Sequence, residues 1–324
     1  MGRIETLKSY PYLFDKTVMD NVIEQAGDTL LILGNGFDID LGFPTRYKDF
    51  FLSDSFPFVN NDLSCHSLGH YVYEKGILDK WYDLENILAE YGSGVAIMDE
   101  EEVEGDKEDY KKLVQGLTDY LCNIDYSQPK RDSVAANILT AAHSYVMPSK
   151  VYTFNYTDFE KVSQLLGVGF SDALYVHGSL KNKNIVLGVG EYKKLGPYTS
   201  YLHKTAHPGY DSHGILNAFE PYDTIIIFGL SLSQVDYPYF EDFFKDVASR
   251  KYMGDRQKYI RIFTYDENSR LEILDNLRGM NSGLIKLMGY SDFDIIRTKD
   301  DIDALKVQEV IGHLSAKWRV EFYR

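Results

Sequence analysis

One stretch, Leu30–Tyr47 with the sequence LLILGNGFDIDLGFPTRY, constrains the fold of this chain more than any other. Its apolar beginning is typical of a buried parallel strand, and Gly34-Asn35-Gly36 follows directly. Glycines at this point allow a tight turn into a helix whose backbone N–H groups can face a phosphate. The stretch therefore predicts an α/β fold with a nucleotide-binding turn, or else a tight turn that binds nothing. The dehydrogenase fingerprint is excluded, because its third glycine would fall on Ile39.

The spacing of glycine and proline in this stretch resembles the first loop of the Sir2 family, G-A-G-x-S-x-x-x-G-I-P-x-F. Asp38 stands where that family usually has serine. The form N-G-F-D is still more similar to the AbiH family of bacteriophage abortive-infection proteins. The resemblance implies that a nucleotide is bound by residues of this loop, namely Gly34, Asn35, Gly36, Asp38 and Pro44.

The composition narrows the class of protein. A net charge of -15 over 324 residues makes nucleic acid an unlikely partner, because nucleic-acid binding depends on lysine and arginine that neutralise phosphates. Two cysteines, Cys65 and Cys122, cannot form a disulfide scaffold or a four-cysteine zinc site. No signal peptide is visible and no apolar run reaches about 18 residues, so we expect a cytoplasmic protein that does not engage a membrane.

The distribution of apolar residues predicts a Rossmann-like α/β core with a mostly parallel sheet, interrupted by a helical insertion. We expect residues 1–52 to begin the core, 53–148 to form the insertion and 149–324 to complete the core. The acidic run 99–109 predicts a solvated loop or a helix start, and 191–222 a long loop or small lid. Strands are expected at 29–34, 151–155, 173–178, 185–190, 224–231, 260–265 and 284–290, and helices at 15–25, 44–52, 158–166, 237–250, 269–279 and 300–313.

Ligands of an open parallel sheet bind beyond the C-terminal ends of its strands, so the residues there are the candidates for a site. Asn155 ends one predicted strand, and a buried amide at that point needs several hydrogen-bond partners, so we expect it to face a ligand. Thr157 and Glu160 have the spacing of a capping box for the next helix. The run resembles T-x-N-Y-D-x-L-x-E of Sir2-like proteins, which implies a nucleotide site that includes Thr153; Thr157 replaces the aspartate of that pattern.

Two further strand ends carry polar residues. His177, followed by glycine, matches in order and spacing the histidine that is the general base of Sir2 proteins, a role that suits a group with a pKa near neutrality. Gly229 and Ser231 resemble the G-x-S strand end that contacts the nucleotide in that family, although Ser231 would serve equally well in a turn. The segment that ends at Asp236 is also similar to the AbiH family.

Some features depart from the Sir2 pattern or stand outside it. Sir2 deacylases carry a zinc module with paired C-x-x-C motifs, which this chain lacks, so protein deacylation is not expected. Glu85, in the stretch W-Y-D-L-E, also resembles the AbiH family. Its plainer interpretation is a solvated or capping carboxylate.

The resemblance implies an anti-phage protein that binds NAD in a Sir2-like pocket and hydrolyses its nicotinamide–ribose bond without a metal. Asn155 and His177 would be the catalytic residues. The alternative is a non-catalytic sensor of NAD or ADP-ribose that signals to a partner, which the replacements at Asp38 and Thr157 favour. The sequence leaves open whether the nucleotide is NAD or a relative, and whether a second copy of the chain or a phage-derived trigger also binds.

Overall fold

The structure is a computed structural model of the chain. It describes residues 29–58, 67–80, 82–95, 98–143, 149–170, 172–210, 215, 218–249, 251, 257–280 and 283–316. The helix expected at 15–25 lies outside these residues, as does Cys65.

The core is a six-stranded sheet in which all neighbouring strands are parallel, in the order β3-β2-β1-β4-β5-β6. This is the strand order of the dinucleotide-binding Rossmann fold, and it confirms the predicted α/β class. From β1 the chain adds β2 and β3 on one side of β1, and it then crosses back to place β4 on the other side. The strand order therefore reverses between β1 and β4. The strands are β1 (Thr29–Leu33), β2 (Lys150–Thr153), β3 (Leu174–Tyr175), β4 (Thr224–Phe228), β5 (Tyr259–Thr264) and β6 (Asp292–Arg297).

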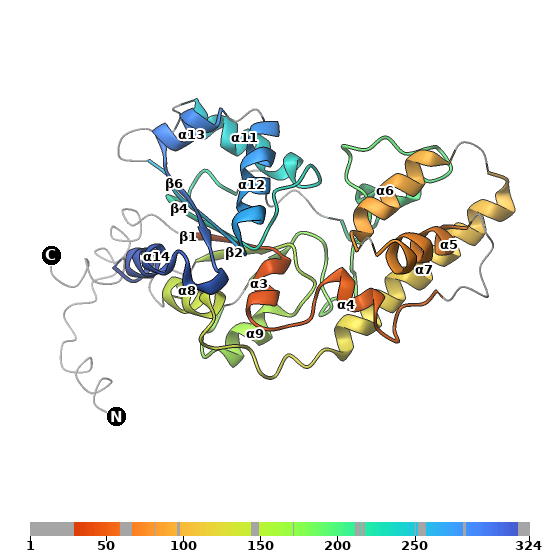
Figure 1. Cartoon of the computed structure of the whole chain (residues 1–324), viewed down its shortest axis with the longest axis horizontal. Helices are drawn as coiled ribbons and strands as arrows, with labels where there is room; N and C mark the ends of the chain where they lie inside the picture. The colour runs from red at the N-terminus through yellow and green to blue at the C-terminus, as the bar shows by residue number, and fades with distance from the viewer. Residues whose placement is uncertain are drawn as a thin grey trace.

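Helices cover both faces of the sheet (Figure 1). Because side chains alternate along a strand, Leu30 and Ile32 of β1 pack into one apolar core and Leu31 and Leu33 into the other. The first core is closed by α11 (Tyr237–Ala248), α12 (Glu267–Gly279) and α13 (Leu284–Tyr290). The second is closed by α3 (Asn35–Asp40), α8 (Val134–Ala142), α9 (Phe159–Leu165) and α14 (Ala304–Ala316).

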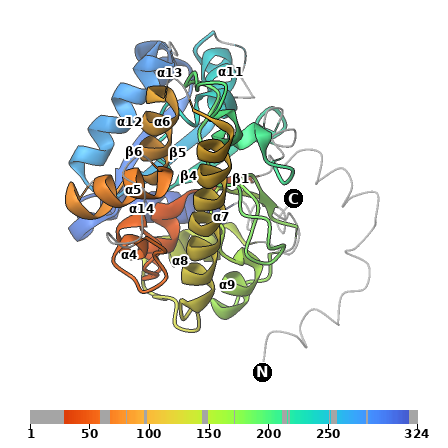
Figure 2. The same cartoon turned by 90° about the vertical axis from the view of Figure 1, so that its right-hand side faces the viewer.

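A group of helices lies beside the C-terminal ends of the strands, and we call it the helical lobe (Figures 1 and 2). It has its own apolar core, in which Phe50, Leu84 and Leu113 are fully buried. Its elements are α4 (Tyr47–Phe51), α5 (Leu68–Tyr73), the π-helical turn η1 (Glu74–Leu78), α6 (Leu84–Gly94) and α7 (Glu100–Asn123). No helix among the residues that the structure describes is long and apolar enough to cross a membrane.

The acidic run 99–109 does more than begin a helix. Asp99 and Glu102 form a capping box at the start of α7, as a helix start predicts. Asp106 and Asp109, one and two turns further on, are buried and accept hydrogen bonds of 2.8 and 3.0 Å from the backbone N–H groups of Leu68 and Gly69, respectively. These carboxylates therefore satisfy the amino end of α5 and join two helices of the lobe.

Two of the expected strands are wrong. Residues 284–290 form α13, because Leu284 and Leu287 lie three positions apart and turn together toward the core formed with α11. The strand follows directly as β6, which the sequence analysis missed; it pairs with β5 from Tyr259↔Asp292 to Thr264↔Arg297.

Residues 185–190 do not join the sheet either. Ile185, Leu187 and Val189 alternate as in a strand, but they pack into the core of the helical lobe. We call residues 185–206 the strap. It contains the short 3-10 turns η2 (Ser200–Leu202) and η3 (Lys204–Ala206), and a third turn of this kind, η4 (Lys299–Asp301), precedes α14.

The strap is held firmly on the lobe. The Tyr110 hydroxyl donates a 2.5 Å hydrogen bond to the carbonyl of Leu187, and the Thr199 hydroxyl donates one of 2.7 Å to the carbonyl of Gly92. A single bridge, Val189↔His203, closes the strap on itself. The first part of the loop expected at 191–222 is thus fixed to the helices of the lobe by hydrogen bonds and by apolar packing.

Candidate functional site

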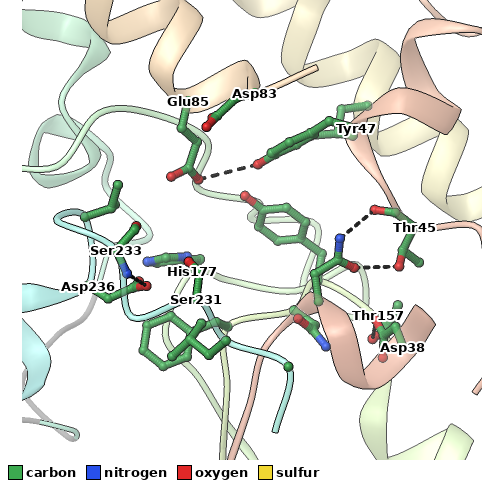
Figure 3. Close-up of a pocket in the computed structure, with 18 of the residues that line it drawn as sticks. Asp38, Thr45, Tyr47, Asp83, Glu85, Thr157, His177, Ser231, Ser233 and Asp236 are labelled. Carbon is green, nitrogen blue, oxygen red and sulfur yellow. Dashed lines mark hydrogen bonds between the residues drawn. The ribbon is translucent and has the colours of Figure 1, made fainter. Parts of the chain in front are cut away.

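A cavity of about 420 Å³ lies where the strand ends meet the helical lobe. Its wall includes residues of the β1–α3 turn, of the ends of β2, β3 and β4, of α6 and of the strap (Figure 3). This position, beside the reversal of strand order between β1 and β4, is where open α/β sheets bind their ligands. Of the predicted site residues, the cavity gathers Asn35, Asp38, Asn155, His177, Gly229 and Ser231.

The glycines of the β1–α3 turn serve backbone packing. The N–H of Gly34 donates to the carbonyl of Phe228 and the N–H of Gly36 to that of Gly229, both at 2.9 Å. A methyl group on Gly36 would lie 2.6 Å from the Cα of Gly229, which itself has a left-handed φ of 67°. Glycine is therefore required here so that two backbones can cross, and the amides of Gly34 and Gly36 are already paired within the protein.

Asn35 lines the cavity together with Thr45, and Pro44 lies next to Thr45 in the chain. The side chain of Asn35 donates to the carbonyl of Thr45 at 3.1 Å and accepts from its hydroxyl at 2.5 Å (Figure 3). Pro44 does not line the cavity; it is exposed, and its carbonyl accepts a 2.7 Å hydrogen bond from Tyr120 of α7. The loop after α3 is thus fixed to the lobe on one side of the cavity.

Asn155 holds the glycine turn in place. Only 6 % of the residue is exposed, and its side-chain amide donates a 3.0 Å hydrogen bond to the carbonyl of Gly34. Its own backbone N–H donates to the hydroxyl of Thr153 at 3.1 Å. Thr153 does not line the cavity, but its hydroxyl fixes the backbone at the end of β2. Asn155 does line the cavity and connects its wall to the glycine turn.

Thr157 has a different role from the one expected of it. The helix α9 is capped by Asp158, whose side chain accepts from the N–H of Lys161, and Glu160 forms an ion pair with Lys181 at 2.6 Å, so the predicted capping box is wrong. The hydroxyl of Thr157 instead donates a 2.8 Å hydrogen bond to the carboxylate of Asp38.

Asp38 is nearly fully buried beside this hydroxyl. Burial raises the pKa of Asp38 to about 7, although hydrogen bonds from Thr157 and Asn155 favour its ionised form. Asp38 stands at the serine of the Sir2 pattern and Thr157 at its aspartate. The carboxylate and the hydroxyl have exchanged places, and they are in contact.

His177 lies in the floor of the cavity, 5 % exposed, against the edge of the Phe154 ring. Burial, together with the charge of Lys204, lowers the pKa of His177 well below its usual range. Its Nε2 lies 3.5 Å from the hydroxyl of Tyr239, which is 2.8 Å from that of Tyr210. His177 is therefore a neutral imidazole that can accept a hydrogen bond.

A buried ion pair forms the roof of the cavity. Lys204 of the strap donates to both carboxylate oxygens of Glu85 in α6, at 2.9 and 3.0 Å, and its side chain is 3 % exposed. Tyr47 of α4 donates to the same carboxylate at 3.4 Å. The plainer interpretation of Glu85, a solvated or capping carboxylate, is wrong. Lys204 was not among the predicted site residues, because no local pattern marks a lysine whose partner lies 119 positions away.

Asp236 lines the cavity beside Ser231 and Ser233, at the end away from Thr45, which we call the inner end (Figure 3). It is 6 % exposed and accepts a 3.1 Å hydrogen bond from the N–H of Ser233. Burial, with a smaller contribution from the charge of Glu85, raises the pKa of Asp236 to about 7 against the attraction of Lys204. Ser231 is exposed, and its carbonyl accepts from Asn276 of α12 at 3.0 Å.

The ionisable side chains of the wall are mostly acidic: Asp38, Asp83, Glu85, Asp236 and Glu272, with Lys204 as the cation. Within the residues that the structure describes, no group of three or more His, Cys, Asp or Glu is arranged to hold a metal ion. The wall suits a ligand that offers hydroxyl groups or positive charge.

These features define a Rossmann-type α/β protein whose cavity, at the reversal of strand order, is closed by a helical lobe and a strap. A family model described as bacteriophage abortive infection AbiH matches residues 30–253, and the chain belongs to this family. The match spans β1 to the segment after α11, so it includes the whole cavity wall except Glu272. No curated protein matches the chain.

Proposed function

We propose that this abortive-infection protein binds NAD in the cavity and hydrolyses the bond between nicotinamide and ribose. The observation that carries the proposal is the convergence of Asn155, His177 and Asp38, which come from three separate segments, on one cavity beside the β1–β4 switch point. Parallel sheets with this strand order bind dinucleotides at that point. The consequence in an infected cell would be depletion of NAD.

The chemistry of the wall fits this reaction. The nicotinamide ring of NAD carries a positive charge, and an oxocarbenium-like positive charge develops on the ribose as the bond breaks. Carboxylates such as Glu85 and Asp236, which are largely removed from solvent, stabilise positive charge better than they would in bulk water. Asn155 would orient the ribose, and the neutral His177 would accept a hydrogen bond from a ribose hydroxyl.

The pyrophosphate of NAD needs its own place, because the amides of Gly34 and Gly36 are already paired. Carboxylates repel phosphates, so the inner end of the cavity beside Asp236 suits the nicotinamide riboside. We therefore assign the pyrophosphate to the opposite end, near Asn35, whose side-chain amide has a second N–H besides the one that it donates to Thr45.

One contact weakens the reason to expect a non-catalytic sensor. It rested on Asp38 and Thr157, which replace the serine and aspartate of the Sir2 pattern. Because the Thr157 hydroxyl donates to the Asp38 carboxylate, the two replacements preserve a hydroxyl–carboxylate pair at the same place. They are therefore no longer a reason to expect a lost activity.

The proposal is tested by incubating the purified protein with NAD and separating nicotinamide and ADP-ribose by chromatography. We expect equal amounts of both products from the wild type, and a loss of release in Asn155→Ala and His177→Ala. Lys111→Ala, in a separate surface groove on α7, is the control and should release nicotinamide at the wild-type rate. Binding of NAD without release by the wild type would support the sensor instead.

A further inference from the structure

We propose that Asp236 is a catalytic residue of this cavity, whose carboxylate takes the proton of the water that attacks ribose C1′. The inference rests on the proposed function and deepens it, since it moves the proton transfer from His177 to a residue at the start of α11. Three observations carry it: the placement of Asp236, its charged neighbours and the state of His177.

The placement of Asp236 is unusual for an aspartate at a helix start. It occupies the N-cap position of α11, where an aspartate normally accepts from the backbone of the first turn, but it makes no such hydrogen bond. One donor of that turn is missing because Pro238 has no N–H. The carboxylate accepts instead from Ser233 N–H and lines the cavity. It therefore does not stabilise its own helix as a cap.

The neighbours of Asp236 set its charge. The positive charge of Lys204 in the strap favours the ionised form of Asp236, whereas the negative charge of Glu85 in α6 disfavours it. Burial and the charge of Asp236 both raise the pKa values of Tyr192 in the strap and Tyr239 in α11. Both hydroxyls therefore remain protonated. With burial included, the pKa of Asp236 rises to about 7, which lets the carboxylate accept and release a proton near neutral pH.

His177 is the weaker proton acceptor of the two. Burial and Lys204 lower its pKa well below the usual range, so the imidazole holds a proton poorly. It remains suited to accept a hydrogen bond from a ribose hydroxyl. The same lysine that disfavours a proton on His177 favours the ionised form of Asp236.

The step balances as follows. The bond between C1′ and the nicotinamide nitrogen breaks, and its electron pair leaves with the nitrogen, which loses its positive charge. The water oxygen forms a bond to C1′, and one proton of the water passes to the Asp236 carboxylate and from there to solvent. The products are nicotinamide, ADP-ribose and a proton.

The test is the pH dependence of kcat and of kcat/KM for wild type, Asp236→Asn and Asp242→Asn. Asp242 is an exposed aspartate on the same helix and is the matched control. Because the carboxylate must be ionised, the wild-type kcat/KM, which reports the free enzyme, should rise with pH, reach half its maximum near pH 7 and then level off. Asp236→Asn should lose roughly 10²- to 10⁴-fold in kcat together with this rise, and Asp242→Asn should keep both.

A second variant separates catalysis from folding. Asp236→Ala should regain part of its kcat in the presence of formate, a small carboxylate that can enter the space left by the side chain, whereas Asn155→Ala should not. If the wild type releases no nicotinamide, the proposed function and this inference fall together. If the wild type is active, an Asp236→Asn variant with unchanged kcat and pH profile overturns the role of Asp236 alone.

Discussion

The hydroxyl of Thr157 donates a hydrogen bond of 2.8 Å to Oδ2 of Asp38, which lies 119 positions earlier in the chain. Each residue departs from the Sir2 pattern, and each departure is explained by the other. The pair joins the segment after β2 to the helix after β1, and both residues line the cavity. A carboxylate buried to this degree requires such a donor.

Exchange of the two groups provides a test of this pair. Thr157→Val keeps the shape of the side chain but leaves the carboxylate without its hydroxyl, so the free energy of unfolding should fall by about 1–3 kcal/mol. The double variant Asp38→Ser with Thr157→Asp restores a hydroxyl opposite a carboxylate and should recover most of this loss in urea unfolding. A double variant whose loss of stability equals or exceeds the sum of the losses in Asp38→Ser alone and Thr157→Asp alone would contradict the pairing of the two sites.

The stability of the protein should depend on pH through Asp38. Its pKa is raised from 3.8 to about 7 by burial, so between these values the folded state binds more protons than the unfolded state. The free energy of unfolding should therefore fall as the pH rises from about 4 to 7, by about 1.4 kcal/mol for each unit of difference in pKa. Asp38→Asn should show a smaller fall in urea unfolding at pH 5 and pH 8. An equal fall in the variant would contradict the raised pKa.

The crossing of backbones at the turn predicts a strong effect of one methyl group. Gly36→Ala would place a Cβ 2.6 Å from the Cα of Gly229, so we expect a loss of at least about 2 kcal/mol in stability. Gly105→Ala, in α7, is the matched control, because its Cβ would meet nothing within 4 Å. It should stabilise the protein by about 0.5–1 kcal/mol. Similar values for both variants would remove the packing argument.

The buried ion pair predicts a partial rescue. Lys204→Met would leave the Glu85 carboxylate without its cation, which should cost about 3–5 kcal/mol. Adding Glu85→Gln removes the unpaired charge and should restore much of the stability, as thermal unfolding would show. If the second change gives no recovery, the contribution of Lys204 is packing of its side chain and not pairing of charge.

The sequence predicted most of the core because its signals are local. The apolar runs of β1 and β4 and the glycine turn between strand and helix need no distant partner to be recognised. The errors arose where a distant partner decides the structure. Residues 284–290 became a helix through contact with α11, and residues 185–190 alternate like a strand but pack on the helical lobe.

The site shows the same division. Strand ends can be found from the sequence, and Asn155 and His177 do line the cavity. Lys204 could not be found, because its role depends on Glu85 in another segment. The roles of Gly34 and Gly36 also depend on a distant element, since only the end of β4 occupies their amides.

The account rests most directly on the rate at which the purified protein releases nicotinamide from NAD. It predicts release with equal amounts of ADP-ribose by the wild type, loss of release in Asn155→Ala, and an unchanged rate in the surface variant Lys111→Ala. A wild type that leaves NAD intact, or an Asn155→Ala variant as active as the wild type, would contradict it.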